Sequence, residues 1–485
     1  MTLEPLQNYI NGRFQPAHDG STLDDLAPAT GERLTTLPNS GPDDVNQAVA
    51  AAKAAMQGPW SKTSAAERAD LCEAIADRIE ADLDAFATLE SADTGKPLAL
   101  AKSLDIPRAV SNFRFFAAAI RSHSEPSFTM ADAVNHTLRG PVGVVGLITP
   151  WNLPLYLLTW KAAPALVTGN AIVAKPSEVT PLTAGRLAEV IDDLGAPPGA
   201  FNLVQGLGPS VGAPLCAHAD VDAVSFTGGT ATGVHVASAV APRFAKLSLE
   251  LGGKNASVVF EDADLEHTVP TVVRAAFTNT GQICLCGSRL FVHRSQYADV
   301  VEAVVAQTKA LVIGDPQDPS TNLGPLVSQA HRAKVERYIA LAKEEGGTLR
   351  TGGPRPELPP PFSNGNFLSP TVIEGLAPDS RTATEEIFGP VLTVHPFDDE
   401  TEVIERVNAV RYGLSASIFT RDLTRAHRVG RALDVGTVWV NTWLKRDLRV
   451  PFGGHKDSGV GREGGDYSLR FFTEPTTLCI QLDPA

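Results

Sequence analysis

The chain has 485 residues, which is too many for one compact core and indicates two or three domains. Its hydrophobic content of 43% and charged content of 20% are typical of a soluble globular protein. A net charge of −14 without any Lys/Arg run argues against a nucleic-acid partner. The start MTLEPLQNYI has no basic residues followed by an apolar core, so no secretory signal is predicted and a cytoplasmic location is expected.

The elements expected along the chain begin with a mostly helical region at about 42–118, which is Ala-rich with acidic residues near the helix starts. Short β-branched runs then alternate with helical segments of about 10–15 residues, which predicts βαβ units and a parallel sheet covered on both faces. Such a sheet binds nucleotides at the carboxyl ends of its strands. The expected strands are 143–149, 170–175, 201–206, 222–228 and 246–253.

A second α/β pattern follows residue 253, with strands expected at 255–260, 288–293 and 437–441. Pro and Gly mark 352–367 as a surface loop. The sequence therefore predicts an α/β protein of two lobes, of which the first is discontinuous.

One uncharged window, Gly140–Trp160, is 21 residues long and could span a bilayer by length alone. Pro141, Pro150 and Pro154 divide it into a strand, a turn and a helix start, so no membrane segment is expected.

Two of the five cysteines, Cys284 and Cys286, lie in the stretch NTGQICLCGSRL. An odd, sparse set of cysteines is typical of free thiols in a reducing compartment. Zinc needs about four ligands, usually at CxxC or HxxxH spacing, so no metal site is predicted. A disulfide between residues i and i+2 would be strained. Packing and nucleophilic catalysis remain as the two explanations.

Candidate phosphate-binding turns follow two of the strands. In FTGGTATG, Gly228 and Gly233 bracket a turn into a helix whose first N–H groups could face a phosphate. The stretch GLGPSVG, with Gly208 and Gly212, has the wrong spacing for GxGxxG and suggests a second turn near a nucleotide. Both are also consistent with ordinary strand–helix turns.

Polar side chains at three other strand ends are further candidates. After the second strand, Glu178 could accept bonds from an adenosine ribose and Lys175 could donate one, although a surface ion pair would look the same. Glu250 ends an apolar strand, where desolvation would raise the pKa of its carboxyl toward the range of a general base. Asn152 follows the first strand, and its amide could stabilise an oxyanion.

The order of these motifs carries more information than each alone. The motifs follow one another in an order and spacing that closely resemble the aldehyde dehydrogenase superfamily, from NGRF at 11 to the C-terminal strand. They are PWNLP, KPSE, FTGGTATG, LELGGK, FTNTGQIC, EEIFGP and PFGGHKDSG. The resemblance implies a Rossmann-type NAD-binding domain in 1–116 and 138–251 and a catalytic domain in 252–452. It also implies a β-hairpin oligomerisation arm in 117–137 and 468–485, and hence a homodimer or homotetramer.

The resemblance further implies how the site works. The Cys284 thiolate would attack an aldehyde to form a thiohemiacetal, whose oxyanion is held by the Asn152 amide and the Cys284 N–H. Hydride would pass to NAD, and Glu250 would activate water to hydrolyse the thioester. Cys286 would serve packing or support the residues that contact the substrate. The implied cofactor contacts are Trp151, Lys175, Glu178, Gly208, Gly212, Phe226, Gly228, Gly233, Leu251, Glu386 and Phe388. Gly229 departs from the family, in which serine is frequent, and Glu178 favours NAD over NADP.

Four stretches look like the corresponding parts of the 2-aminomuconic and 2-hydroxymuconic semialdehyde dehydrogenases. They are DIPRAVSNFRFFA, WNLPLYLLTWK, CLCGSR and NTWLKRDLRVPFGG. Substrates of that subfamily carry a distal carboxylate, for which a guanidinium is a suitable anchor. Arg114 and Arg446 are the expected anchors, with Arg449 as a substitute for Arg446 and with Tyr156 and Trp160 beside them. The alternative is that Arg446 forms a surface ion pair with Asp447 and that Arg114 only supports a helix.

The sequence is also compatible with other functions. Within the enzyme class, they are betaine, succinic or general aliphatic and aromatic aldehyde dehydrogenases. A cofactor-independent cysteine esterase or acyltransferase belongs to a different class, but no plausible His partner lies near Cys284 in the sequence. A non-catalytic binding protein is the third alternative.

Overall fold

The predicted run of short apolar strands forms the central sheet of the first lobe in the computed structural model, which describes residues 3–482. Its strands run parallel in the order β9-β8-β7-β10-β11, and β1, β2 and β21 extend the two edges antiparallel. The bounds are β7 Val144–Ile148, β8 Ala171–Lys175, β9 Phe201–Leu203, β10 Ala223–Thr227, β11 Lys246–Glu250, β1 Asn8–Ile10, β2 Arg13–Gln15 and β21 Gly459–Val460. Every residue of β7 and β8 is buried, as expected for a parallel sheet covered on both faces.

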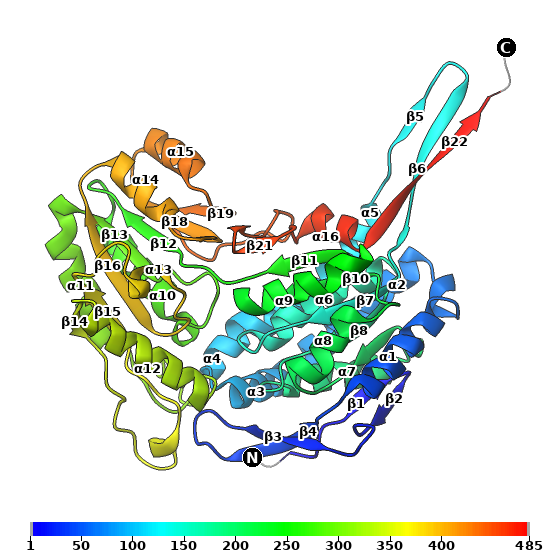
Figure 1. Ribbon diagram of the computed structural model, residues 1–485, viewed down its shortest axis with the longest axis horizontal. Helices are drawn as coiled ribbons and strands as arrows, with labels where there is room; N and C mark the ends of the chain where they lie inside the picture. Colours follow the sequence, from blue (N-terminus) through cyan, green and yellow to red (C-terminus); the bar gives the residue numbers. More distant parts are fainter. Residues whose placement is uncertain (1–2, 483–485) are drawn as a thin grey trace.

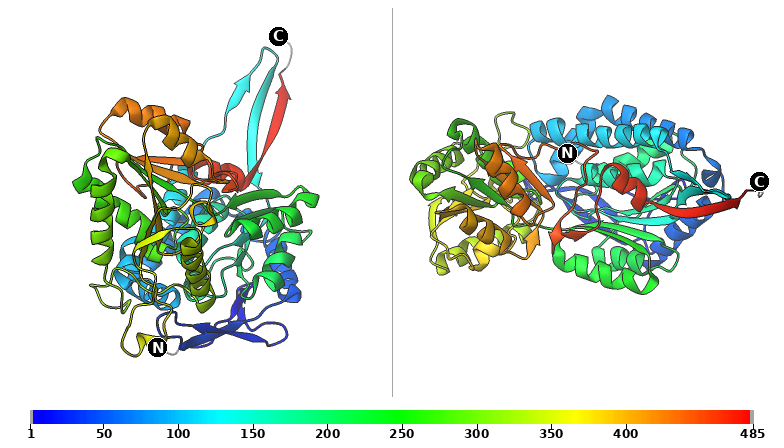
Figure 2. Two further views of the ribbon diagram at one scale, coloured as in Figure 1. Left: turned by 60° about the vertical axis from the view of Figure 1, so that its left-hand side comes forward. Right: turned by 90° about the horizontal axis from the view of Figure 1, so that it is seen from above.

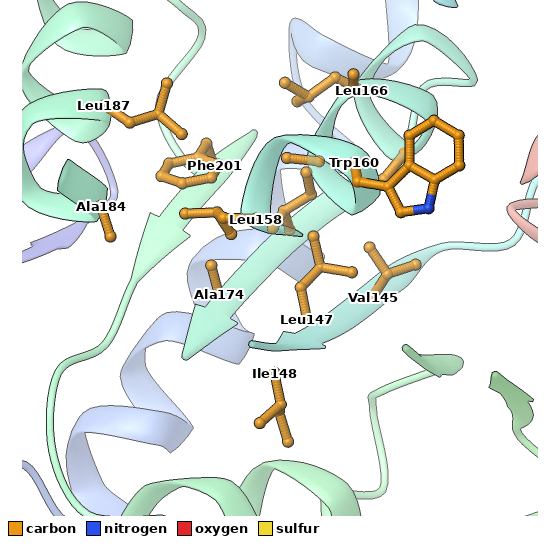
Figure 3. Packing of buried hydrophobic residues seen from close by; sticks show 14 of the residues in the cluster. Val145, Leu147, Ile148, Leu158, Trp160, Leu166, Ala174, Ala184, Leu187 and Phe201 are labelled. Carbon is orange, nitrogen blue, oxygen red and sulfur yellow. The ribbon is translucent and has the colours of Figure 1, made fainter. Parts of the chain in front are cut away.

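Helices cover this sheet and pack on it through apolar side chains. Figure 3 shows Trp160, Leu158 and Leu166 of α6 beside Val145 and Leu147 of β7. The Ala-rich stretch from 65 to 94 forms two helices, because a capping box at Ser64 starts one and the second begins after Asp82. The bounds are α1 Pro42–Ala55, α2 Ala65–Ala81, α3 Leu83–Thr94, α4 Leu98–Leu100, α5 Ile106–Ser122, α6 Pro154–Val167, α7 Leu182–Asp193, α8 Ala213–Ala217, α9 Thr230–Val240 and α16 Gly465–Phe471.

The second lobe holds a seven-stranded sheet in the order β14-β15-β16-β13-β12-β18-β19, parallel except for the β14–β15 pair. Its strands are β12 Ala256–Val259, β13 Arg289–His293, β14 Thr348–Thr351, β15 Thr371–Glu374, β16 Val391–Phe397, β18 Ser415–Phe419 and β19 Thr437–Val440. Its helices are α10 Leu265–Phe277, α11 Tyr297–Lys309, α12 Gln329–Glu344, α13 Arg381–Thr384, α14 Glu400–Asn408 and α15 Leu423–Ala432. Figure 1 shows the two lobes side by side.

Two short antiparallel pairs complete the body: β3 Thr22–Leu26 with β4 Arg33–Pro38, and β17 Tyr412–Gly413 with β20 His455–Lys456. After β20 the chain returns to the first lobe, where β21 pairs with β11. None of the helices within residues 3–482 is long and apolar enough to cross a membrane.

A three-stranded antiparallel arm projects from the first lobe (Figures 1 and 2). It consists of β5 Ser127–Thr129, β6 Ala133–Pro141 and β22 Thr473–Gln481, in the order β22-β6-β5. The predicted arm boundaries are therefore shifted. The range 117–122 belongs to α5, β6 continues to Pro141, and α16 packs on α6 of the first lobe. The last three residues of the predicted arm, 483–485, lie outside the described residues.

Candidate active site

The carboxyl ends of β7, β10 and β11 meet the second lobe at a cavity of about 250 Å³. Strand ends of a parallel sheet are where such folds bind ligands. A larger cavity of about 670 Å³ lies within the second lobe, but its lining includes no cysteine. The residues that line the smaller cavity include Trp151, Asn152, Glu250, Leu251, Cys284, His331, Glu386 and Phe388.

The loop that carries Cys284 has a strained backbone. Asn279, Thr280 and Gly281 have φ angles of 53°, 56° and 74°, so three consecutive residues are left-handed. This conformation is costly for a β-branched residue such as Thr280, and strain of this kind is concentrated at functional sites. A Cβ on Gly281 would lie 2.1 Å from the Gly389 carbonyl oxygen, so only glycine fits this approach.

Side-chain amides and an indole hold the carbonyl groups of this loop. Asn255 Nδ2 donates to the carbonyls of Cys284 (2.6 Å) and Cys286 (3.0 Å). Trp443 Nε1 donates to the carbonyl of Leu285 (2.8 Å). Cys286 is buried in the hydrophobic core, and its thiol donates a hydrogen bond to the carbonyl of Thr278 (3.8 Å), which fits the predicted packing role.

The same loop leaves donors available for an oxyanion. The Cys284 N–H makes no hydrogen bond with any residue from 3 to 482. Asn152 Nδ2 donates one N–H to the Gln282 carbonyl (2.9 Å), which orients the amide and leaves its second N–H free. Both donors belong to residues that line or border the cavity, so the geometry can stabilise negative charge beside the Cys284 sulfur.

Burial raises the pKa of the Cys284 thiol to about 12, and the negative charges of Glu250 and Glu386 contribute in the same direction. The positive charge of Arg446 opposes this shift. The thiol is therefore protonated at neutral pH and needs a proton acceptor before it can act as a nucleophile.

Glu250 ends β11 and is 4% exposed. Neither of its carboxyl oxygens has a hydrogen-bond partner among the described residues. Burial, together with the negative charge of Glu463, raises the pKa of Glu250 well above its usual value, as the sequence analysis predicts. Glu463 is itself held by the fully buried Lys161 Nζ (2.5 Å) and by Ser225 Oγ (3.1 Å). A carboxyl with a raised pKa is suited to general-base catalysis.

Several predicted cofactor residues have the chemistry that a dinucleotide requires. At the end of β8, the buried Lys175 pairs with the half-buried Glu178 (2.9 Å). Glu386 accepts a hydrogen bond from the Gly253 N–H (2.9 Å) at the cavity wall. A Cβ on Gly252 would lie 2.0 Å from the Glu386 carboxylate, so glycine is required for that side chain to reach its place. Glu178 and Glu386 are thus two carboxylates near the carboxyl edge of the first-lobe sheet, and carboxylates can accept hydrogen bonds from the hydroxyl groups of the two riboses in a dinucleotide.

The other predicted cofactor residues divide into two groups. Trp151, Leu251, Gly228 and Phe388 line the cavity. Gly233, Phe226, Gly208 and Gly212 do not line it. A Cβ on Gly228 would strike the Phe226 ring at 2.4 Å, and one on Gly233 would strike Leu251 at 2.7 Å, so packing accounts for these glycines. Gly208 and Gly212 lie in a π-helical turn, Gly208–Gly212, that follows β9.

Arg446 lies close to the nucleophile and has no carboxylate within ion-pair distance among the described residues. Its Nη1 donates to the Tyr156 hydroxyl (3.2 Å). Its guanidinium lies over the Phe452 ring (3.7 Å) and the Trp160 ring (5.4 Å), so the buried Trp160 supports the arginine. Asp447 pairs with Arg449 instead (2.6 Å), and both are exposed. The surface-pair alternative for Arg446 is therefore wrong, and so is Arg449 as its substitute.

The structure gives Arg114, one of the two predicted anchors, other partners than a substrate. Arg114 is exposed, and its guanidinium is paired with Asp77 (2.8 Å) and Glu80 (2.6 Å) of α2. Arg108, on the same helix, lies over the Tyr156 ring at 5.3 Å and has no ion pair with a described residue. Six residues turn a helix by about 600°, which places the two arginines on different faces.

The contacts of Asn112 show which face of α5 carries Arg108. Asn112 is four residues further on, and its Nδ2 donates to the Tyr156 carbonyl (3.1 Å). Positions i and i+4 share a helix face, so the buried position of Asn112 marks Arg108 as facing α6. The structure therefore brings together Tyr156, Arg446 and Arg108.

Residues 14–478 match the aldehyde dehydrogenase family. The chain is 48% identical over 480 residues to the 2-aminomuconic semialdehyde dehydrogenase of Danio rerio, with 98% of both chains covered. It is 46% identical over 486 residues to the 2-hydroxymuconic semialdehyde dehydrogenase of Pseudomonas sp. (strain CF600), covering 99% of this chain and 100% of that one. The solved NAD+ complex of an aldehyde dehydrogenase from Bacillus cereus has a TM-score of 0.96 at 40% identity, covering 99% of this chain and 97% of that one.

These findings confirm the predicted α/β fold and the prediction of an NAD-dependent oxidoreductase. The match covers residues 14–478. The cavity brings together Cys284, Glu250 and Asn152, as the resemblance predicts. The chain belongs to the aldehyde dehydrogenase family.

Proposed function

We propose that this aldehyde dehydrogenase oxidises a semialdehyde that carries a distal carboxylate, of the 2-hydroxymuconic or 2-aminomuconic class that its relatives' names give. The observation that carries the proposal is that two arginines contact Tyr156: Arg108 lies over its ring and Arg446 donates to its hydroxyl. Neither guanidinium has a carboxylate partner among the described residues, whereas Arg114 and Arg449 nearby are both paired.

Two cations without counter-ions are costly to desolvate, and an anionic substrate group would offset that cost. A guanidinium recognises a carboxylate through two parallel hydrogen bonds, which fixes the orientation of the substrate as well as its charge. Arg446 lowers the pKa of the Cys284 thiol, so it acts within electrostatic range of the nucleophile. A substrate carboxylate on Arg446 would therefore place the aldehyde end near the sulfur.

The side chains at the cavity then account for the chemistry. Glu250, with its raised pKa, accepts the thiol proton, and the Cys284 thiolate attacks the aldehyde carbon. The Asn152 amide and the Cys284 N–H hold the oxyanion of the thiohemiacetal, and each such donor is typically worth about 100- to 1000-fold in rate. NAD, when bound, takes up the hydride. After Glu250 has released the thiol proton to solvent, its carboxylate draws a proton from water. The water oxygen then adds to the thioester carbon, the C–S bond breaks, and the acid is released as the Cys284 thiolate leaves.

Glu178, Lys175, Glu386 and Phe388 are proposed to hold the cofactor. We further propose that the arm assembles homodimers or homotetramers, because strands β5, β6 and β22 expose large apolar side chains. These include Phe128 of β5 (62% exposed) and Leu138 of β6 (49%). All five cysteines are free, which supports the proposed cytoplasmic location.

The test is a substrate panel with purified protein and NAD. Enzymatically generated 2-hydroxymuconic semialdehyde is compared with benzaldehyde, betaine aldehyde and succinic semialdehyde, and NADH formation is followed alongside loss of the dienoic absorbance. A kcat/KM at least about tenfold higher for the muconic substrate is expected, because two half-buried guanidinium groups without counter-ions favour a substrate that carries a carboxylate. Equal kcat/KM values across the panel would contradict the proposed substrate. Ester hydrolysis without any NADH formation would favour a cysteine esterase instead.

A further inference from the structure

One residue of the cavity wall has no part in the steps above. His331 lies in the first turn of α12 and lines the cavity together with Trp151 and Phe388. The three rings contact one another although they come from separate segments. The ring centroids are 5.0 Å apart for Trp151–His331, 5.3 Å for Trp151–Phe388 and 6.1 Å for His331–Phe388. All three pairs have the edge-to-face geometry that aromatic rings prefer.

A hydrogen bond fixes the role of the imidazole within this cluster. His331 Nε2 lies 2.7 Å from the carbonyl oxygen of Phe388, and because a carbonyl can only accept, Nε2 carries the hydrogen. Burial lowers the pKa of His331 to about 4, and the positive charge of Lys334 acts in the same direction. The ring is therefore neutral at pH 7 and donates a single N–H to the backbone.

The backbone that receives this bond is strained. Phe388 has a φ of 63°, a left-handed conformation that is an outlier for a bulky residue. Such a conformation persists only where the surroundings impose it. Ser328 caps the start of α12 through the His331 N–H (3.2 Å), so the imidazole is held on a fixed helix start. The strained peptide is thus anchored to a rigid element.

We propose that His331 is a positioning residue for hydride transfer, because it holds Phe388 in the conformation that forms the cofactor side of the cavity. This inference rests on the proposed function, in which Phe388 and Glu386 help to hold NAD. Asn255 and Trp443 hold the Cys284 loop separately, without any bond to His331. Loss of the imidazole should therefore impair oxidation with NAD while leaving the thiol chemistry intact.

The experiment compares two reactions of the same protein. Hydrolysis of p-nitrophenyl acetate without NAD reports on Cys284 and Glu250, and NADH formation from 2-hydroxymuconic semialdehyde reports on the complete reaction. The variant His331→Leu keeps the bulk but removes the donor, and His331→Gln restores an N–H. Gln329→Leu, an exposed change in the same helical turn, is the matched control.

For His331→Leu we expect ester hydrolysis within about twofold of wild type and a fall in NADH formation of about 5- to 100-fold, the range for an unsatisfied buried carbonyl. His331→Gln should recover most of that loss, and Gln329→Leu should change neither rate. If the Leu variant does not fold, His331→Met takes its place. An equal fall in both reactions, or no fall in NADH formation, overturns the role of His331. Wild-type protein that hydrolyses the ester but forms no NADH with any aldehyde overturns the proposed function instead.

Discussion

Replacing Arg446 by Met tests the substrate anchor most directly. Met keeps an unbranched apolar stem that can remain packed between Phe452 and Trp160. The change removes the guanidinium that donates to the Tyr156 hydroxyl and, on the proposed function, to the substrate carboxylate. It therefore isolates the charge and its hydrogen bonds from the bulk of the side chain.

The size of the effect follows from the surroundings of the guanidinium. Removing one partner of a buried, hydrogen-bonded charge pair costs about 2–5 kcal/mol. Because Arg446 is only half-buried and Arg108 remains over the Tyr156 ring, the lower half of that range applies, which corresponds to a fall in kcat/KM of about 30- to 300-fold. A neutral aldehyde also loses some rate, because Arg446 lowers the pKa of the Cys284 thiol. The ratio of the two kcat/KM values is therefore the quantity that reports on the anchor.

The assay is steady-state NADH formation with 2-hydroxymuconic semialdehyde and with benzaldehyde for each variant. Arg449→Met is the matched control, since Arg449 lies three residues away, is exposed and is paired with Asp447 at 2.6 Å. That control should leave both kcat/KM values within about twofold, as surface ion pairs contribute little. A ratio that stays constant in Arg446→Met, or one that falls equally in Arg449→Met, would refute the reasoning.

Two further predictions follow from the same site. Arg108→Met should lower kcat/KM for the muconic substrate by about tenfold or more, whereas Arg114→Met, on another face of the same helix, should have no effect in the same NADH assay. Because the pKa of the Cys284 thiol is raised to about 12, its alkylation by iodoacetamide, mapped by peptide mass, should rise with pH up to pH 10 without a plateau. Arg446→Met should slow that alkylation at each pH, because a cation that lowers the pKa has been removed.

Much of the fold could be predicted because it depends on local pattern. The strand expected at 143–149 is Val144–Ile148, and the one expected at 170–175 is Ala171–Lys175. Both are apolar runs bounded by turn residues, and a strand buried on both faces requires that composition. The arm begins later than predicted because α5 continues to Ser122. Where α5 ends depends on its packing against α2, which no local signal in the sequence encodes.

The substrate side shows how helix phase decides a role that residue type alone cannot. Arg108 and Arg114 both lie in the stretch DIPRAVSNFRFFA, and the guanidinium of either could bind a carboxylate. Only the packing of α5 against α6 determines which of them faces Tyr156. The partners of Arg114, Asp77 and Glu80, lie on α2, more than thirty residues earlier, and the sequence gives no sign of that contact.

The general base shows the same limit at longer range. The sequence predicts that Glu250 is desolvated because it ends an apolar strand, and its 4% exposure agrees. Burial is the largest cause of the raised pKa of Glu250, and the charges that add to it come from elsewhere: Glu463 raises the pKa, while Lys161 and Arg446 lower it. Lys161 and Glu463 are 302 residues apart and meet only because the chain returns to pair β21 with β11. Periodicity and motif spacing can therefore identify the catalytic groups, whereas the pKa values that make them reactive are determined by contacts between segments distant in the sequence.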